Sequence, residues 1–215
     1  MPAPDQPTHS VLVCNFPDPN TVQGPALLDH REVVTYFHEF GHLVHALMRG
    51  RLPWARLARP VEFDFIEAPS QFLEQWIFDH SVLRRFARRI ETGEPISEAM
   101  VAKLREARDF GRGVQTQRAV FMSMVSLELH DRDPRDLDIM KIWHEVGREW
   151  SPVELDGEGR FPASWTHMPG YASAYYTYTL SRAVAEDLST AFRGGLMDTR
   201  QTDRKSTRLN SSHRL

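Results

Sequence analysis

Hydrophobic residues recur at helical spacing in the segment between residues 28 and 49. They occupy positions 33, 36, 37, 40, 44, 47 and 48, which share one side of a helix with 3.6 residues per turn. Gly50 follows this pattern, and glycine commonly ends a helix. The pattern therefore predicts an amphipathic helix over residues 28–49.

Similar periodicity, bounded by Gly and Pro, predicts the other elements of the chain. We expect further helices over residues 68–90, 97–110, 115–129, 136–150 and 171–192. Residues 10–16 are short and β-branched at their centre, so they are expected to form a strand, whereas residues 151–165 are expected to form a loop. The expected fold class is mainly α, with one or two short strands.

The composition is ordinary for a globular protein, and its charge points to no particular class of partner. Hydrophobic residues make up 41% and charged residues 26% of the chain, and the formal net charge is -3. This balance gives no reason to expect binding to nucleic acid or to an anionic membrane. No apolar run has the length of a membrane span, and the start does not resemble a signal peptide. The single cysteine, Cys14, excludes an internal disulfide and a thiolate metal cluster.

The end of the chain differs in character from the rest. Residues 203–215 are rich in Ser and Arg, lack hydrophobic periodicity and resemble the translation of a short-read sequencing adapter. We therefore expect residues 1–202 to be the native part and residues 203–215 to be a non-native tail. The alternative is a genuine polar tail.

The most specific chemical signal is the pentapeptide His38-Glu39-Phe40-Gly41-His42, within the first predicted helix. Two histidines four residues apart point the same way from a helix and can close on one metal ion. Glu39 then lies beside the metal and can take a proton from water. The alternative is a solvated helix with an accidental match.

A catalytic zinc usually takes three protein ligands and leaves a fourth position open. Glu67 is the best third candidate by spacing, because it stands at the entry of the next predicted helix. Glu62, Asp64 and Glu74 compete with it, and Glu74 is seven residues further on, where it could support a ligand. Spacing alone also allows Glu67 to be a first-turn carboxylate favoured by the helix dipole.

The segment from Trp165 to Tyr178 is unusually aromatic. Tyr171, Tyr175 and Tyr178 are spaced i, i+4 and i+7, which places them on one face of the last predicted helix. Such hydroxyls can stabilise the oxyanion of peptide hydrolysis, and the alternative is an aromatic stripe in the core.

Three motifs together resemble the thimet oligopeptidase family of zinc metallopeptidases, which includes oligopeptidase A and bacterial dipeptidyl carboxypeptidases. The motifs are the segments 38–45, 65–71 and 167–178, and the resemblance covers about residues 8–195. It implies a zincin-like helical catalytic domain with a deep channel and peptide substrates of limited length. Members of the family are much longer, so the resemblance also implies that this chain is the catalytic C-terminal portion of a longer parent. The sequence leaves the oligomeric state open, and we expect the parent to be monomeric.

The resemblance also implies roles for particular residues. The metal ligands would be His38, His42 and Glu67, with Glu39 as the catalytic base. The oxyanion and the substrate would be bound by residues of the aromatic segment, namely His167, Gly170, Tyr171, Tyr175 and Tyr178. One departure is the single glycine in Met168-Pro169-Gly170, where many members have two and a longer spacing from the histidine.

The sequence thus predicts that residues 1–202 are a partial catalytic domain that hydrolyses short peptides with one zinc ion per chain. The alternative is a truncated, non-catalytic zinc-binding fragment. The expected partners are oligopeptides, with neither nucleic acid nor membrane. We expect a cytoplasmic location, with the periplasm as the alternative if the native N-terminus lies upstream.

Overall fold

The computed structural model describes residues 9–49, 61–192 and 195–197. The expected adapter-derived tail, residues 203–215, lies outside the described residues. The chain divides into two compact units. The first comprises residues 1–61, 68–105 and 182–215, and the second comprises residues 62–67 and 106–181.

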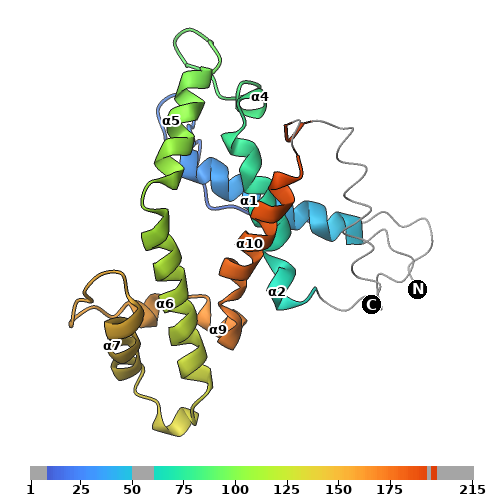
Figure 1. Cartoon of the computed structure of the whole chain (residues 1–215). Helices are drawn as coiled ribbons and strands as arrows, with labels where there is room; N and C mark the ends of the chain where they lie inside the picture. The colour runs from blue at the N-terminus through green and yellow to red at the C-terminus, as the bar shows by residue number, and fades with distance from the viewer. Residues whose placement is uncertain (1–8, 50–60, 193–194, 198–215) are drawn as a thin grey trace. The chain divides into compact units, whose positions relative to one another are not determined.

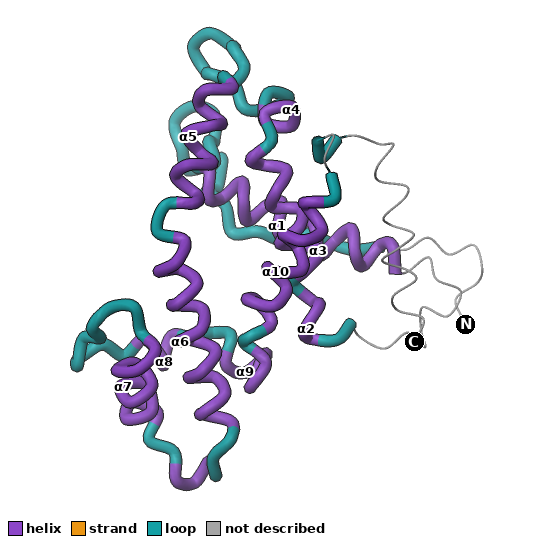
Figure 2. Tube along the Cα trace, viewed as in Figure 1, coloured by secondary structure: helices purple, strands orange, loops and turns teal. Residues whose placement is uncertain are grey.

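The expectation of a mainly α fold is confirmed, because helices joined by loops make up the described part of the chain (Figure 2). The elements, drawn in Figure 1, are α1 (His30–Arg49), α2 (Phe63–Ile66), α3 (Ala68–Leu73), η1 (Glu74–Phe78), α4 (His80–Leu83), α5 (Glu98–Asp109), α6 (Arg112–His130), η2 (Pro134–Asp136), α7 (Ile139–Trp150), α8 (Phe161–Ser164), α9 (Met168–Tyr171), η3 (Ala172–Ala174) and α10 (Thr177–Thr190). Here η denotes a 3₁₀-helix.

The strand expected at residues 10–16 is wrong, because this segment has no regular structure. Val11 and Val13 are 84% and 76% exposed, whereas Phe16 packs its ring against Tyr36 of α1. A strand is defined by hydrogen bonds to a neighbouring strand. Within the described ranges the only β-type pairing is an isolated bridge between Arg88 and Pro95, so residues 10–16 find no partner there.

The first unit is built on α1. Helix α3 and the 3₁₀-helix η1 pack against it. The buried side chains of this unit include Ile77, Leu83 and Val101, and the predicted apolar face of α1 contributes Val33 and Phe37 to the same cluster. The half-buried side chains of Val33 and Phe37 help to hold α1 in place, whereas Tyr36 and Met48 of the predicted face are exposed.

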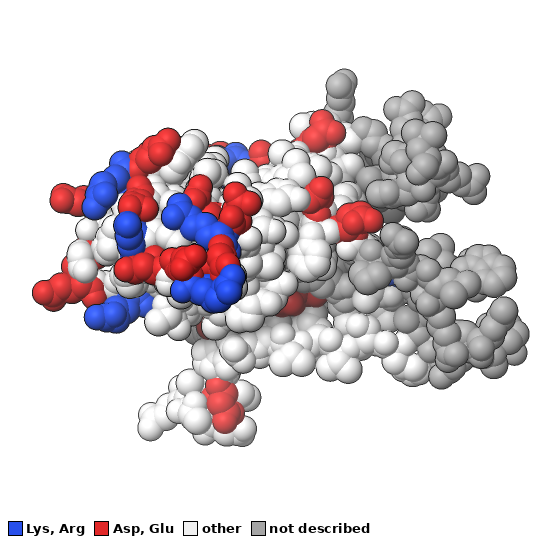
Figure 3. Space-filling view, turned by 90° about the horizontal axis from the view of Figure 1, so that it is seen from below, with Lys and Arg blue, Asp and Glu red and all other residues white. Residues whose placement is uncertain are grey.

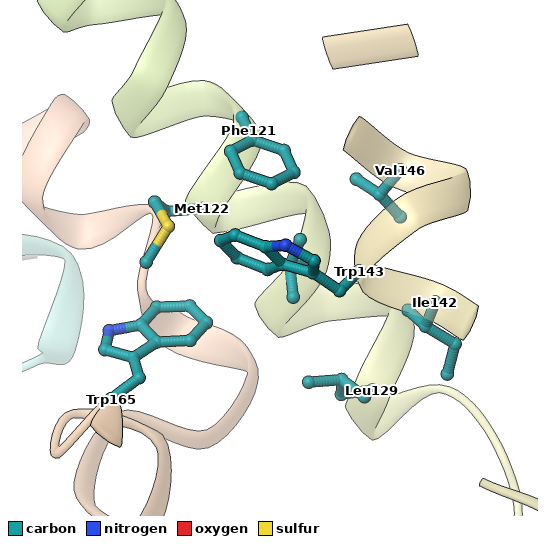
Figure 4. Close-up of a cluster of buried hydrophobic side chains, with 8 residues drawn as sticks. Phe121, Met122, Leu129, Ile142, Trp143, Val146 and Trp165 are labelled. Carbon is teal, nitrogen blue, oxygen red and sulfur yellow. The ribbon is translucent and has the colours of Figure 1, made fainter. Parts of the chain in front are cut away.

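The second unit has its own core, where α6 packs against α7. Figure 4 shows the side chains that meet there, with Trp143 of α7 against Phe121 of α6 at 4.7 Å between ring centroids. Trp165, which follows α8, belongs to the same cluster and contacts Tyr175 at 4.9 Å between centroids. Trp165, the first residue of the aromatic segment, therefore anchors this segment to the core of the second unit.

Two of the expected helices are interrupted. The helix expected over residues 68–90 divides into α3, η1 and α4, because Asp79 is extended and its side chain accepts a hydrogen bond from the Ser81 amide. Asp at such a position caps a new helix in preference to continuing an old one. The helix expected over residues 171–192 divides at Ala172, which has a positive φ of 47°.

The face drawn in Figure 3 carries acidic and basic side chains intermixed, and neither sign gathers on it. No helix in the described part of the chain combines the length and the apolar character that crossing a membrane requires.

Candidate metal and peptide site

Helix α1 presents His38 and His42 one turn apart. Their rings lie edge to face, with 5.0 Å between centroids, so both side chains point to the same region. Glu39 lies between them in the chain and is half-buried. Burial raises the pKa of the Cys14 thiol, and the negative charge of Glu39 raises it further.

Glu67 lies between α2 and α3 and is only 2% exposed. Its peptide bond leads directly into Ala68, the first residue of α3, and α3 packs on α1. The two helices approach closely at Gly41, since a Cβ atom there would lie 2.5 Å from the Ser70 Cα. A glycine between Glu39 and His42 thus permits a close contact near the start of α3.

The candidate ligand atoms of His38, His42 and Glu67 lie within 4.8 Å of one another. Two imidazoles and one carboxylate form the donor set of several catalytic zinc sites, with a fourth position left for water. The residues present therefore fit a zinc ion.

Glu74 supports His38 as its spacing suggested. The Glu74 Oε1 atom lies 2.6 Å from Nδ1 of His38. An ionised carboxylate only accepts hydrogen bonds, so it favours the tautomer with the proton on Nδ1. The Nε2 atom of His38 is then left with the lone pair that a metal needs.

The other acids considered for the third ligand lie outside this group. Glu62 is exposed and precedes α2, and the Asp64 side chain accepts a hydrogen bond from the Tyr176 hydroxyl. His45 is half-buried, and its pKa is lowered by burial and then by the neighbouring charges of Arg49 and His42. Glu67 is thus the acid that the structure groups with the two histidines.

The aromatic segment forms a ring cluster within the second unit. The centroid distances from the His167 ring to the rings of Tyr171, Tyr175 and Tyr178 are each 5.7 Å. The expectation of one continuous helical face was wrong, because Tyr171 ends α9 and Tyr178 belongs to α10. The cluster is built from α9, η3 and the start of α10. Gly170 of α9 is exposed.

The tyrosine hydroxyls of the cluster remain protonated. Burial raises the pKa of Tyr178 far above its ordinary value, and a hydrogen bond with Tyr171 raises it further. Burial also raises the pKa of Tyr175. Both side chains therefore keep an O–H donor at any pH near neutrality.

Hydrogen bonds connect this segment to α2 and to the residue that follows it, and two of the donors, Thr177 and Ser181, were not singled out from the sequence. The Tyr171 hydroxyl donates to Oε1 of Glu67 at 2.5 Å. The Thr177 hydroxyl donates to the Phe63 carbonyl, and the Ser181 hydroxyl donates to the Asp64 carbonyl at 3.1 Å. The sequence held one signal for these two contacts: Thr177 and Ser181 are four residues apart, which places both hydroxyls on one helical face.

Comparison with known proteins gives a family and several relatives. The model of a family described as Peptidase family M3 matches residues 3–210. The mitochondrial intermediate peptidase of Aspergillus clavatus is 33% identical over 189 residues, covering 82% of this chain and 24% of the relative. The organellar oligopeptidase A of Arabidopsis thaliana is 34% identical over 194 residues, covering 87% and 24%. Oligopeptidase A of Escherichia coli is 33% identical over 187 residues, covering 84% and 27%. The chain thus spans about a quarter of the length of these relatives.

Proposed function

Since the chain belongs to peptidase family M3, which confirms the resemblance to the oligopeptidases, we propose that it is the metal-binding catalytic portion of a zinc-dependent oligopeptidase. The observation that carries this proposal is the convergence of candidate ligand atoms from His38, His42 and Glu67. One zinc ion per chain would be held by these three residues. The substrates would be short peptides.

A bound zinc would polarise the scissile carbonyl and lower the pKa of water. Glu39 follows His38 directly on α1, so its carboxylate is the group that accepts a proton from the attacking water and passes it to the leaving amine. Glu74 holds the ring of His38 through Nδ1.

The aromatic cluster is proposed to serve the substrate. The hydroxyls of Tyr171 and Tyr178, with the N–H of His167, would donate to the oxyanion that develops on the carbonyl. Tyr175 and the exposed Gly170 would contact the rest of the peptide.

The second candidate is a zinc-binding fragment without activity of its own, and the length of the relatives favours it. The chain covers 24% to 27% of the relatives compared here. If the rest of such a protein forms the opposite side of a substrate channel, these residues would bind metal but would not hold a peptide for attack.

Metal content and peptide hydrolysis of three purified proteins separate these proposals. The unmodified chain should carry one zinc, His42→Ala should carry far less, and Glu39→Gln should keep zinc but lose hydrolysis, because an amide cannot accept the proton. Equal zinc in the unmodified chain and His42→Ala would refute the site. Zinc binding without hydrolysis of a fluorogenic peptide by the unmodified chain would favour the non-catalytic fragment.

The compartment stays a prediction from the sequence. The relatives of this chain in Arabidopsis thaliana include a probable cytosolic oligopeptidase A and an organellar oligopeptidase A. We keep the cytoplasm as the proposed location and propose a monomeric parent.

A further inference from the structure

The hydrogen bond from Tyr171 to Glu67 joins two motifs that are 104 residues apart in the chain. The donor is the Tyr171 hydroxyl, the acceptor is Oε1 of Glu67, and the O···O distance is 2.5 Å. The Tyr171 ring also lies edge-on to Phe63 of α2, with 5.7 Å between centroids. Both contacts are made within the second unit, so neither depends on the placement of the first.

This hydrogen bond restricts what the Tyr171 hydroxyl can do. A phenol has one proton to donate. While the proton is directed to Glu67, it is not available to an oxyanion on a substrate. A donor to one carboxylate oxygen also restricts the rotation of the carboxylate group.

The backbone next to Tyr171 is held in an unfavourable conformation. Ala172 has φ 47° and ψ -123°, and it is the one non-glycine residue with a positive φ in the described ranges. The carbonyl oxygen of Ala172 accepts a hydrogen bond from the Ser126 hydroxyl, and Ser126 is fully buried in α6. A strained conformation persists only where the surroundings hold it, and this contact is such a restraint.

Residues of the same segment also restrain the backbone that leads to Glu67. The buried hydroxyls of Thr177 and Ser181 donate to the carbonyls of Phe63 and Asp64, in the short helix that precedes Glu67. The segment from Tyr171 to Ser181 therefore contacts Glu67 by its side chain and the preceding residues by their main chain.

We propose that Tyr171 is a positioning residue for the third metal ligand: its hydroxyl orients the Glu67 carboxylate, and the contact between Ser126 and Ala172 holds Tyr171 where it can do so. This inference rests on the proposed zinc site but assigns Tyr171 a role in the substrate-free chain that is separate from oxyanion binding. Loss of an oxyanion donor leaves the affinity for zinc unchanged, whereas loss of a positioning residue weakens it.

The first test is the zinc dissociation constant of this chain, measured by competition with a chromophoric chelator in the absence of peptide. Tyr171→Phe should weaken zinc binding about 10- to 100-fold, the usual range for groups that support a ligand. Tyr175→Phe is the matched control, because it removes a hydroxyl from the same cluster but not one that contacts Glu67. Equal affinity in Tyr171→Phe and the unmodified chain would overturn the proposal. So would an equal loss in both variants.

A second pair of variants tests the restraint without touching the cluster. Ser126→Ala should weaken zinc binding, whereas Ser123→Ala should not, because the Ser123 hydroxyl donates to the Ala119 carbonyl of its own helix. Adding Ala172→Gly to Ser126→Ala should restore the affinity, because glycine adopts a positive φ without strain. Unchanged affinity in Ser126→Ala, or no rescue by glycine, would overturn the role of this contact.

The unmodified chain separates failure of this inference from failure of the proposed function. If it binds no zinc, the metal site is wrong and the inference falls with it. If it binds zinc and Tyr171→Phe binds equally well, the metal site stands and only the positioning role is refuted. Circular dichroism of each variant without zinc shows whether an affinity loss reflects unfolding. If Tyr171→Phe is unfolded, the rescue of zinc affinity in Ser126→Ala by Ala172→Gly decides whether the proposal stands.

Discussion

The close approach of α1 and α3 at Gly41 predicts a large effect of a single methyl group. In Gly41→Ala, the added Cβ atom would lie 2.5 Å from the Ser70 Cα and 2.7 Å from the Pro69 carbonyl oxygen. Both neighbours are main-chain atoms, so no side chain can rotate away to relieve the contact. The helices must move apart, and the start of α3 directly follows Glu67.

Two opposing terms set the size of the effect. Overpacking of a buried contact typically costs about 1–3 kcal/mol, and a contact with rigid main chain on both sides belongs at the upper end, about 3 kcal/mol. Alanine in place of glycine inside a helix contributes about 1 kcal/mol in the opposite direction. The net loss of unfolding free energy is therefore about 2 kcal/mol. For a chain of this size, that corresponds to a fall of about 4–8 °C in melting temperature.

Thermal unfolding followed by circular dichroism, with a chelator present, measures this loss without a contribution from bound zinc. Gly113→Ala is the matched control, because it makes the same substitution in helix α6 at a position with no atom within 4 Å of the new Cβ. That variant should melt at or slightly above the temperature of the unmodified chain. If Gly41→Ala also melts there, the close approach of the two helices is wrong.

Two further predictions concern polar groups of the first unit. Glu74→Ala should weaken zinc binding about 10- to 100-fold, because His38 loses the acceptor at Nδ1. The control Glu62→Ala should leave the zinc dissociation constant unchanged. If Glu74→Ala binds zinc as tightly as the unmodified chain, Glu74 does not support the site. Burial lowers the pKa of His30, and the negative charge of Asp29 opposes this shift. As the pH falls below about 6.5, His30 therefore binds a proton in the unfolded chain before it does so in the folded chain. The folded state loses stability over this range, until the pH reaches the lowered pKa. His30→Leu should therefore show a smaller fall in melting temperature than the unmodified chain between pH 7.5 and 5.5, and an identical fall would contradict this reasoning.

The features that the sequence predicted are those determined by local spacing. The helix that carries His38 and His42 follows from the recurrence of apolar residues, and Val33 and Phe37 of that pattern are found against the core. The spacing of seven residues from Glu67 made Glu74 a candidate to support a ligand, but it did not indicate which one, because His38 and Glu74 are 36 positions apart. The helix of the two histidines needs only the helical period.

The features that the sequence did not predict depend on contacts between distant segments or on a single backbone angle. No local signal indicates that Tyr171 contacts Glu67, because the two residues are 104 positions apart. The positive φ of Ala172 contradicts the preference of alanine, and it interrupts a helix that the periodicity favours. The expected strand failed for a related reason: β-branched residues favour a strand, but pairing requires a neighbour that local sequence cannot supply.

The contacts around the proposed ligands favour a metal site over an accidental match to the histidine motif. A chance H-E-x-x-H pattern would place two imidazoles on one side of a helix, but it would not orient them. Here Glu74 fixes the ring of His38, and Tyr171 fixes the carboxylate of Glu67. Both supporting residues lie outside the five-residue motif, and each leaves its ligand with an atom that can bind a metal. The case for a metal centre therefore rests on these two hydrogen bonds as much as on the motif, and the variants Glu74→Ala and Tyr171→Phe test it at two ligands independently.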